Sequence, residues 1–316
     1  MRASRSGAHA ARMIEVRGLT KDYGRTRAVD DLSFDVRPGH VTGFLGPNGA
    51  GKSTTMRMIL GLDRPTRGTA LVLGRQYPAH HRPLWEVGAV LESRAVHGGR
   101  SAYHHLLCLA QSNGIGRRRV HEVLGLVGLG EAAGRRARTF SLGMSQRLGL
   151  AAALLGDPAV LLCDEPVNGL DPEGIHWIRS LLRTLAAQGR TVFVSSHLMS
   201  EMALTADHLI VVGRGRLLAD ASVAEVIAAS VSGYVLVRSP DDTVLAPRLR
   251  AAGATVRPHR DGGLEVSGLD CAAVGELAGR AGVVLHELSP QQASLEAAFL
   301  ELTAGSVDFA SESGAS

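Results

Sequence analysis

The chain has 316 residues, of which 34 are basic and 30 acidic, and its composition is 45% hydrophobic and 20% charged. These values are typical of a folded globular protein and exclude a disordered chain. No run of about 20 apolar residues is present, which excludes a membrane-spanning helix. The length predicts roughly two domains. Only two of the basic residues are lysines, Lys21 and Lys52; the other 32 are arginines.

Two further features of the composition bear on the environment of the protein. Residues 1–12 are rich in Arg, Ser and Ala without an apolar centre, so we expect a flexible N-terminus and not a secretory signal. Three cysteines, Cys108, Cys163 and Cys271, are widely spaced, which favours free thiols in a reducing compartment. We therefore expect a cytoplasmic protein. Because aromatic residues are only 4% of the chain, we expect a core of Leu, Val, Ala and Ile.

The first two thirds of the chain alternate between strand and helix patterns. This alternation predicts an α/β domain with a mostly parallel sheet over residues 13–220, including a helical subdomain at about 100–155. The expected strands are 14–19, 32–36, 41–45, 87–91, 159–163, 191–194 and 208–212, and residues 68–73 are a further short apolar run. The expected helices outside the subdomain are 53–60, 172–187 and 198–206.

The pattern changes after about residue 221. Residues 221–303 predict a small α+β domain, and the Ser-, Gly- and Ala-rich residues 304–316 predict a disordered tail. We expect strands at 234–238 and 283–287, a hairpin at 255–266, and helices at 245–252, 272–281 and 295–302. Pro247 is compatible with its helix only in the first turn.

A glycine-rich loop follows the apolar strand 41–45 and opens the next helix. Its residues match the G-x-x-x-x-G-K-[ST] phosphate-loop pattern. The backbone N–H groups of such a loop and the positive end of the helix dipole favour phosphate binding. Lys52 supplies a point charge to the outer phosphates, and Ser53 is a candidate Mg²⁺ ligand. The predicted ATP-binding set is Gly46, Pro47, Asn48, Gly49, Ala50, Gly51, Lys52, Ser53 and Thr54.

Two acids end the apolar strand 160–163. Asp164 at the strand end is placed to hold Mg²⁺, and Glu165 to polarise a water molecule that attacks the phosphate. A strand ending in two solvated acids would be the simpler interpretation if it stood alone. The phosphate loop elsewhere in the chain favours the catalytic interpretation.

With these motifs in order, residues 13–220 resemble the ATP-binding subunits of ABC transporters. The signature segment resembles Phe140-Ser141-Leu142-Gly143-Met144-Ser145-Gln146-Arg147. The resemblance implies that Ser141 and Gly143 face the γ-phosphate of ATP bound to a second copy of the chain, and that Asp171 organises the dimer seam. It also implies that His197 contacts the γ-phosphate and that Tyr23 stacks on adenine.

The chain departs from the usual family pattern at two places. Glu92 stands where the family usually has a glutamine that touches Mg²⁺ and links to the membrane partner. Leu142 and Met144 stand where the common signature has Gly and Gln, so we expect weaker or slower but retained activity. Both changes resemble the drug and peptide-antibiotic export branch, which includes daunorubicin-resistance, bacitracin-resistance and lantibiotic-immunity subunits.

The resemblance implies an ATPase that uses ATP and Mg²⁺ to drive export through a separate, multi-spanning permease. Such a subunit works as an ATP-sandwich dimer, peripheral on the inner face of the cell membrane. A non-transport ABC ATPase and a nucleotide-dependent regulatory module are the alternatives. Nucleic acid is not an expected partner, because the net charge is only +4 and the arginine clusters lack an aromatic platform.

Overall fold

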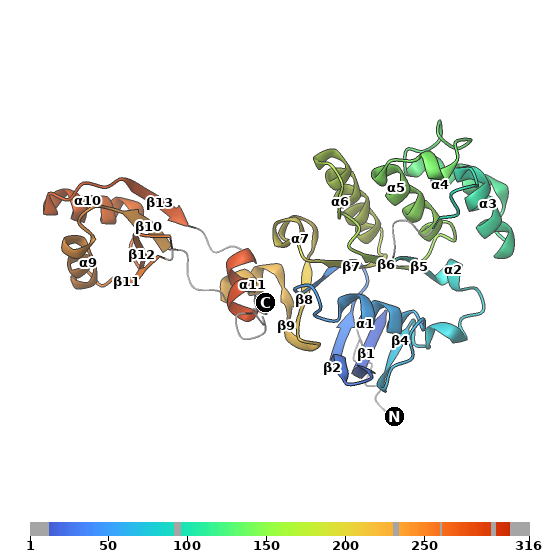
Figure 1. The fold of residues 1–316 in the computed structure, drawn as a ribbon, viewed down its shortest axis with the longest axis horizontal. Coiled ribbons are helices and arrows are strands. Elements are labelled where there is room, and N and C mark those ends of the chain that lie inside the picture. Colours follow the sequence, from blue (N-terminus) through green and yellow to red (C-terminus); the bar gives the residue numbers. More distant parts are fainter. Residues whose placement is uncertain (1–12, 92–95, 230–233, 260, 292–294, 304–316) are drawn as a thin grey trace, which may run out of the picture. The chain divides into compact units, whose positions relative to one another are not determined.

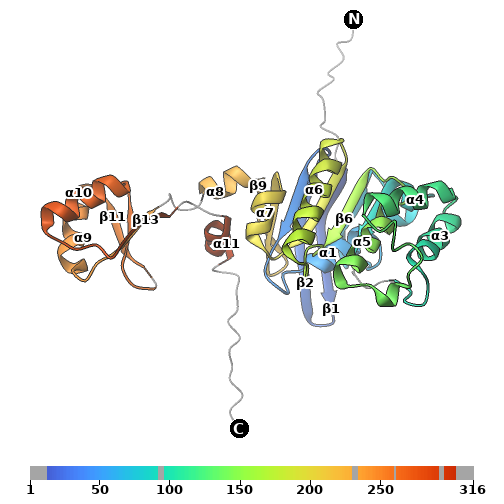
Figure 2. The same cartoon turned by 90° about the horizontal axis from the view of Figure 1, so that it is seen from above.

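The computed structural model describes residues 13–91, 96–229, 234–259, 261–291 and 295–303. They form two compact units. The described residues up to Val223, together with Leu302 and Thr303, belong to the first unit, and Ala224–Glu301 form the second (Figures 1 and 2). None of the described helices combines the length and the apolar character that a bilayer crossing requires.

A six-stranded sheet is the frame of the first unit. Its strands are parallel except the last, and α6 (Pro172–Ala187) and α7 (Met199–Thr205) pack against it. The strands follow the order β5 (Val87–Val90), β6 (Val160–Asp164), β7 (Thr191–Ser196), β3 (Val41–Leu45), β8 (His208–Gly213) and β9 (Arg216–Ser222).

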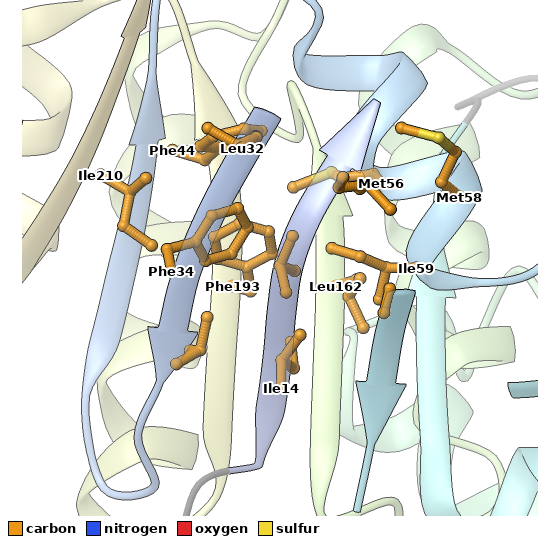
Figure 3. Close-up of a cluster of buried hydrophobic side chains, with 14 of the residues drawn as sticks. Ile14, Leu32, Phe34, Phe44, Met56, Met58, Ile59, Leu162, Phe193 and Ile210 are labelled. Atoms are coloured by element: carbon orange, nitrogen blue, oxygen red, sulfur yellow. The ribbon is translucent and has the colours of Figure 1, made fainter. Parts of the chain in front are cut away.

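A second, antiparallel sheet has the order β2 (Thr26–Val36), β1 (Ile14–Tyr23) and β4 (Arg67–Val72). Its apolar side chains, those of α1 (Lys52–Ile59) and those of the parallel strands share one core cluster. Figure 3 shows Phe34 of β2, Phe44 of β3 and Phe193 of β7 among the side chains of this cluster. Their ring centroids lie 5.2–5.7 Å apart. Although aromatic residues are rare in the chain, three of them lie together in this core, beside the aliphatic side chains that the composition predicted.

The helical part of the first unit consists of α3 (Ala102–Ser112), α4 (Arg117–Leu126) and α5 (Leu142–Ala153), which lie side by side in both views (Figures 1 and 2). Their buried faces repeat at helical spacing, which explains why the sequence pattern identified them. Short helical segments elsewhere in the first unit are Tyr77–Ala79, α2 (Pro83–Glu86) and Ala137–Thr139.

The second unit contains a β-α-β-β-α-β arrangement of the split βαβ type. Its antiparallel sheet has the order β11 (Thr255–Pro258), β12 (Leu264–Ser267), β10 (Tyr234–Arg238) and β13 (Glu287–Gln291). Helices α9 (Asp242–Ala251) and α10 (Cys271–Ala281) share a core cluster with this sheet. The remaining helices are α8 (Val223–Ala229) and α11 (Leu295–Thr303).

Two boundaries in this region differ from the prediction. Helix α9 begins at Asp242, so Pro247 lies in its interior and not in its first turn. The burial of Leu245 and Leu249 against the sheet outweighs the backbone hydrogen bond that proline removes.

The last strand of the second unit was also misplaced, since residues 283–286 form no strand and β13 starts only at Glu287. Gly282 ends α10 in the left-handed conformation, and Val283 then fills the core from a loop. Strand β13 pairs with β10 alone at the sheet edge, a position that tolerates Pro290.

Candidate functional site

The candidate site lies where three neighbouring parallel strands end. Leu45 at the end of β3 is paired with Ser196 of β7, and Asp164 at the end of β6 is paired with Ser195 of β7. The loop 46–51, the acids after β6 and the residues after β7 therefore meet at one edge of the sheet. This edge, outside the carboxyl ends of parallel strands, is the usual ligand-binding place in open α/β sheets.

Backbone packing explains the glycine before the loop lysine. Gly51 has φ 93°, and a Cβ atom built there would overlap the carbonyl oxygen of Ala28 in β2. The Gly51 carbonyl accepts hydrogen bonds from the Thr55 N–H and the Thr55 hydroxyl, each at 2.9 Å. Close contact with β2, in addition to phosphate access, thus requires glycine at position 51.

Lys52, the first residue of α1, folds back over the loop. Its side chain is only 7% exposed, and Nζ donates to the carbonyl oxygens of Gly46 at 2.7 Å and Pro47 at 3.3 Å. Nζ also lies 3.6 Å from Oε1 of Glu165. Burial lowers the pKa of Lys52, and the neighbouring charge of Glu165 opposes that effect. The ammonium group is therefore held beside the loop by two backbone carbonyls and the Glu165 carboxylate.

Glu165 links the loop lysine to the histidine after β7. Its Oε2 lies 2.8 Å from Nδ1 of His197, and its other carboxylate oxygen faces Lys52. The Glu165 backbone has φ 49°, a left-handed conformation that costs a non-glycine residue about 1–3 kcal/mol. Such strain at a residue that also contacts two other side chains of the site is typical of functional sites.

Ser195 is a site residue to which the sequence analysis assigned no role. Its buried hydroxyl donates a short hydrogen bond to Oδ1 of Asp164 and accepts one from the Glu165 N–H at 2.9 Å. One side chain therefore contacts both the Asp164 carboxylate and the Glu165 backbone. Its position two residues before the histidine, at the end of an apolar strand, was the only signal in the sequence.

Tyr23 lies at the end of β1, with its side chain near α1. Its hydroxyl donates to Oδ2 of Asp63 at 3.0 Å, and Lys21 Nζ lies 4.9 Å from its ring centroid. Partial desolvation raises the pKa of Tyr23, and Asp63 adds to this, whereas the hydroxyl of Thr54 lowers it. The residue remains 48% exposed. Lys21, which had no explanation in the sequence, also donates to the Arg64 carbonyl at 2.7 Å.

The signature segment opens α5, and Ser141 caps this helix. The Ser141 hydroxyl accepts from the Met144 N–H at 3.2 Å, and Gly143 lies in the first turn. Gln146 is buried and donates to the Pro166 carbonyl at 2.6 Å, which joins α5 to the residue after Glu165. Sequence reasoning gave Gln146 no such role.

The variant residue Leu142 packs toward the turn after Pro166. Gly169 there has φ 72°, and a Cβ atom added to it would lie 2.6 Å from Cδ2 of Leu142. Asp171, which follows, caps α6 by accepting from the Gly174 N–H at 2.9 Å.

The structure thus brings Lys52, Asp164, Glu165 and His197 together at one edge, with Ser53 exposed in the first turn of α1. It does not join the signature residues to that group. No hydrogen bond or ion pair among the described side chains connects Ser141 or Asp171 to Lys52 or the two acids. Glu92 lies outside the described residues.

Comparisons with known proteins match this architecture. Residues 29–168 match the family model "ABC transporter", and residues 233–296 match a domain of unknown function. An ATP-binding subunit of an ABC transporter of known structure has a TM-score of 0.63 and 26% identity, over 68% of this chain and 92% of that one.

Two curated relatives carry more specific names. The bacitracin transport ATP-binding protein BcrA of Bacillus licheniformis is 42% identical over 65% of this chain and 68% of its own length. The daunorubicin/doxorubicin resistance ATP-binding protein DrrA of Streptomyces peucetius is 33% identical over 94% of both chains. This chain therefore belongs to the ATP-binding proteins of ABC transporters, a family that binds and hydrolyses ATP.

Proposed function

We propose that the chain powers export of a lipophilic or antibiotic-like compound through a separate membrane permease. The observation that carries the ATPase part is the contact of Lys52 and His197 with the two oxygens of Glu165, beside the phosphate loop. The export part rests on the relatives, one named for bacitracin transport and one for resistance to daunorubicin and doxorubicin.

ATP binds, in this proposal, to the loop residues 46–51 and to Lys52, Ser53 and Thr54. The carbonyls of Gly46 and Pro47 hold the Lys52 ammonium in place. Phosphate oxygens are stronger partners for an ammonium than carbonyls, so Lys52 exchanges these bonds for phosphate contacts. Tyr23 offers a half-exposed ring for stacking on adenine, and its bond to Asp63 holds that ring in position.

Glu165 acts as the general base in this scheme. It accepts a proton from water as the water oxygen attacks the γ-phosphorus, and the bond from that phosphorus to the bridging oxygen of ADP breaks. His197, 2.8 Å from Oε2 of Glu165, orients the carboxylate and leaves Nε2 available for the γ-phosphate. Ser195 holds the Glu165 backbone in its strained conformation.

Ser53 and Asp164 would hold Mg²⁺, which screens the phosphate charge when bound. The residues fit such an ion in donor type, since hydroxyl and carboxylate oxygens suit Mg²⁺. The Ser53 side chain is exposed and bonds to no described residue, and one oxygen of Asp164 is oriented by Ser195. Glu92 is a further candidate ligand on sequence grounds alone.

A second copy of the chain would complete the site with its signature segment. Ser141 and Gly143 lie at the start of α5, where unpaired backbone N–H groups and the helix dipole favour an anion. No described cation forms a hydrogen bond or ion pair with Ser141, which suits a phosphate that is already bound to the phosphate loop of the other chain. Asp171 would contribute to the same seam through its position at the start of α6.

A mostly apolar cavity of about 440 Å³ supports a permease contact. It lies between α1, β5, α3 and α5, and Leu91 on its wall directly precedes Glu92. An apolar segment of the permease seated there would touch the chain next to the site. In this proposal, the protein works at the inner face of the cell membrane.

Purification of the tagged chain from native membranes tests the proposal. We expect a multi-spanning protein to copurify and to raise the ATP turnover of the chain after reconstitution. Recovery of an active ATPase without any membrane partner would contradict the transport part alone. Absence of ATP turnover in both preparations would contradict the catalytic assignment as well.

A further inference from the structure

A second, cationic cleft lies in the helical part of the first unit. It has a volume of about 680 Å³ and is formed by the start of α3, by α4 and by the loop before the signature segment. Its lining residues include Arg100, Ser101, Tyr103, His104, His121 and Arg136. None of these residues belongs to the ATP site described above.

Backbone hydrogen bonds hold the two sides of this cleft together. The N–H groups of Ala102 and Tyr103 donate to the carbonyls of Arg135 and Ala133 at 3.1 and 2.9 Å, and the Ala137 N–H donates to Arg100 at 2.9 Å. Ser101 and Arg136 form an isolated antiparallel bridge. These main-chain contacts therefore hold the backbones of Arg100 and Arg136 close to each other.

The charge of this region is strongly positive. Residues 96–153 contain eight arginines and only two acids, Glu122 and Glu131, although the whole chain has a net charge of only +4. Glu122 is already paired with Arg118 and Arg119 on α4. Arg100 and Arg136 make no ion pair with any residue that the structure describes.

The buried side chain of His105 is affected by the same positive charge. The pKa of His105, on the inner side of α3, is lowered by burial first and then by the charges of Arg100 and His97. Since the Arg100 guanidinium disfavours another positive charge here, it would favour an anion at the same place.

Aromatic and polar groups complete the lining. The Tyr103 ring centroid lies 5.0 Å from that of His121 and 5.4 Å from that of His104. The Ser101 hydroxyl lies 2.8 Å from Nδ1 of His104. Residues that carry guanidinium, imidazole, phenol and hydroxyl groups thus line one concave space, and its described lining contains no acidic residue.

We propose that this cleft binds a phosphate-bearing anion through Arg100 and Arg136, with His104, His121 and Tyr103 as further donors. Two guanidinium groups and several single donors suit an anion that presents several oxygens in different directions. The phosphate belongs either to the headgroup of an anionic phospholipid or to a free phosphate compound. This site is separate from the ATP site, and its existence does not depend on the export proposal.

Two binding measurements on the full chain identify the source of the phosphate. In the first, inorganic phosphate is titrated at constant ionic strength, and the imidazole NMR signals of His104 and His121 are followed after assignment by H104Q and H121Q. In the second, the protein is sedimented with vesicles of phosphatidylglycerol in phosphatidylcholine and with vesicles of phosphatidylcholine alone. Phosphate bound at the ATP loop leaves the two histidine signals unchanged.

The test variant is R100Q/R136Q, and the control R82Q/R248Q removes two exposed arginines outside the cleft. We expect binding to the test variant to weaken at least about tenfold, and binding to the control to stay within about twofold of the wild type. The variant R100K/R136K keeps both charges and should recover part of the affinity. Thermal unfolding of each variant verifies that it is folded.

The two measurements separate the outcomes. Histidine shifts together with phosphatidylglycerol-dependent sedimentation, both lost in R100Q/R136Q, indicate a lipid headgroup. Shifts without sedimentation indicate a free phosphate compound. The proposal is wrong if neither measurement detects binding, or if the control variant loses as much affinity as the test variant.

Discussion

The phosphate loop and the signature segment both place a serine at the start of a helix, and the two are built differently. In the loop, Lys52 supplies a cation, and the Ser53 hydroxyl bonds to no described residue. In the signature segment, the Ser141 hydroxyl is used to cap its own helix, and no described cation joins it. The loop is thus complete within one chain, whereas the signature segment offers only helix-end amides to an anion. A helix start attracts an anion through its free N–H groups and its dipole, and a cation beside it strengthens the binding of phosphate.

The largest expected effect concerns the catalytic carboxylate of the complete site. Glu165→Gln should lower ATP turnover by about 10²–10⁴-fold, because an amide cannot accept the proton from water. ATP binding should persist, since Lys52 and the loop are retained, and the dimer should accumulate with ATP. Steady-state ATPase assays and gel filtration with ATP measure both effects.

The matched control is Glu173→Gln, an exposed acid in the first turn of α6. If Glu165→Gln turned over ATP at the rate of this control, Glu165 would have no catalytic role. If Glu165→Gln stayed monomeric with ATP, this would contradict the proposal that the signature segment of one chain contacts ATP bound to the phosphate loop of another.

Lys52 tests whether the loop needs a compact cation. Lys52→Ala should weaken ATP binding by about 10–100-fold, in line with the loss of about 1.5–3 kcal/mol from charged hydrogen bonds. Lys52→Arg should recover little of this affinity, because the planar guanidinium does not fit where Nζ reaches both the Gly46 and the Pro47 carbonyls. Titration with a fluorescent ATP analogue measures the affinities, and full recovery by arginine would contradict this explanation.

Ser195 tests whether the two acids need a common support. Ser195→Ala removes the hydrogen bonds to Asp164 and to the Glu165 N–H, and leaves that partly buried N–H without its partner. We expect ATP turnover to fall about tenfold and unfolding free energy to fall by about 1–3 kcal/mol. The affinity for ATP should change less than turnover. Equal losses in affinity and turnover would show that the serine supports binding and not catalysis.

The smallest expected effect concerns the packing beside the signature segment. Gly169→Ala places a Cβ atom 2.6 Å from Leu142 Cδ2 in a left-handed backbone, and should destabilise the chain by about 1–2 kcal/mol. Leu142→Ala in the same chain should recover the part that is due to the clash. Denaturant unfolding of the single and double variants measures this coupling. Additive effects of the two substitutions would rule out a packing role for Leu142 at this turn.

Local patterns were sufficient for much of the site and the fold. The phosphate loop is contiguous, so its spacing alone predicted Lys52 and Ser53 at a helix start, and the structure has α1 begin at Lys52. The apolar run before Asp164 likewise predicted a strand that ends in two acids, as β6 does. In the second unit, local patterns failed where packing overrides them. Pro247 is inside a helix because neighbouring leucines are buried, and Val283 fills the core from a loop.

Residue chemistry and short spacing were enough to identify the phosphate loop, the acids and the family, because those properties belong to contiguous stretches of chain. Residue chemistry and short spacing did not predict that β6, β7 and β3 pair with one another. This pairing brings Ser195 to Asp164 and Glu165, and Glu165 to both Lys52 and His197, over separations of 30 residues or more. The cleft at Arg100 and Arg136 also exists only because a loop bonds back to α3. Long-range strand order and main-chain bridging determine which side chains meet, and no local pattern encodes either of them.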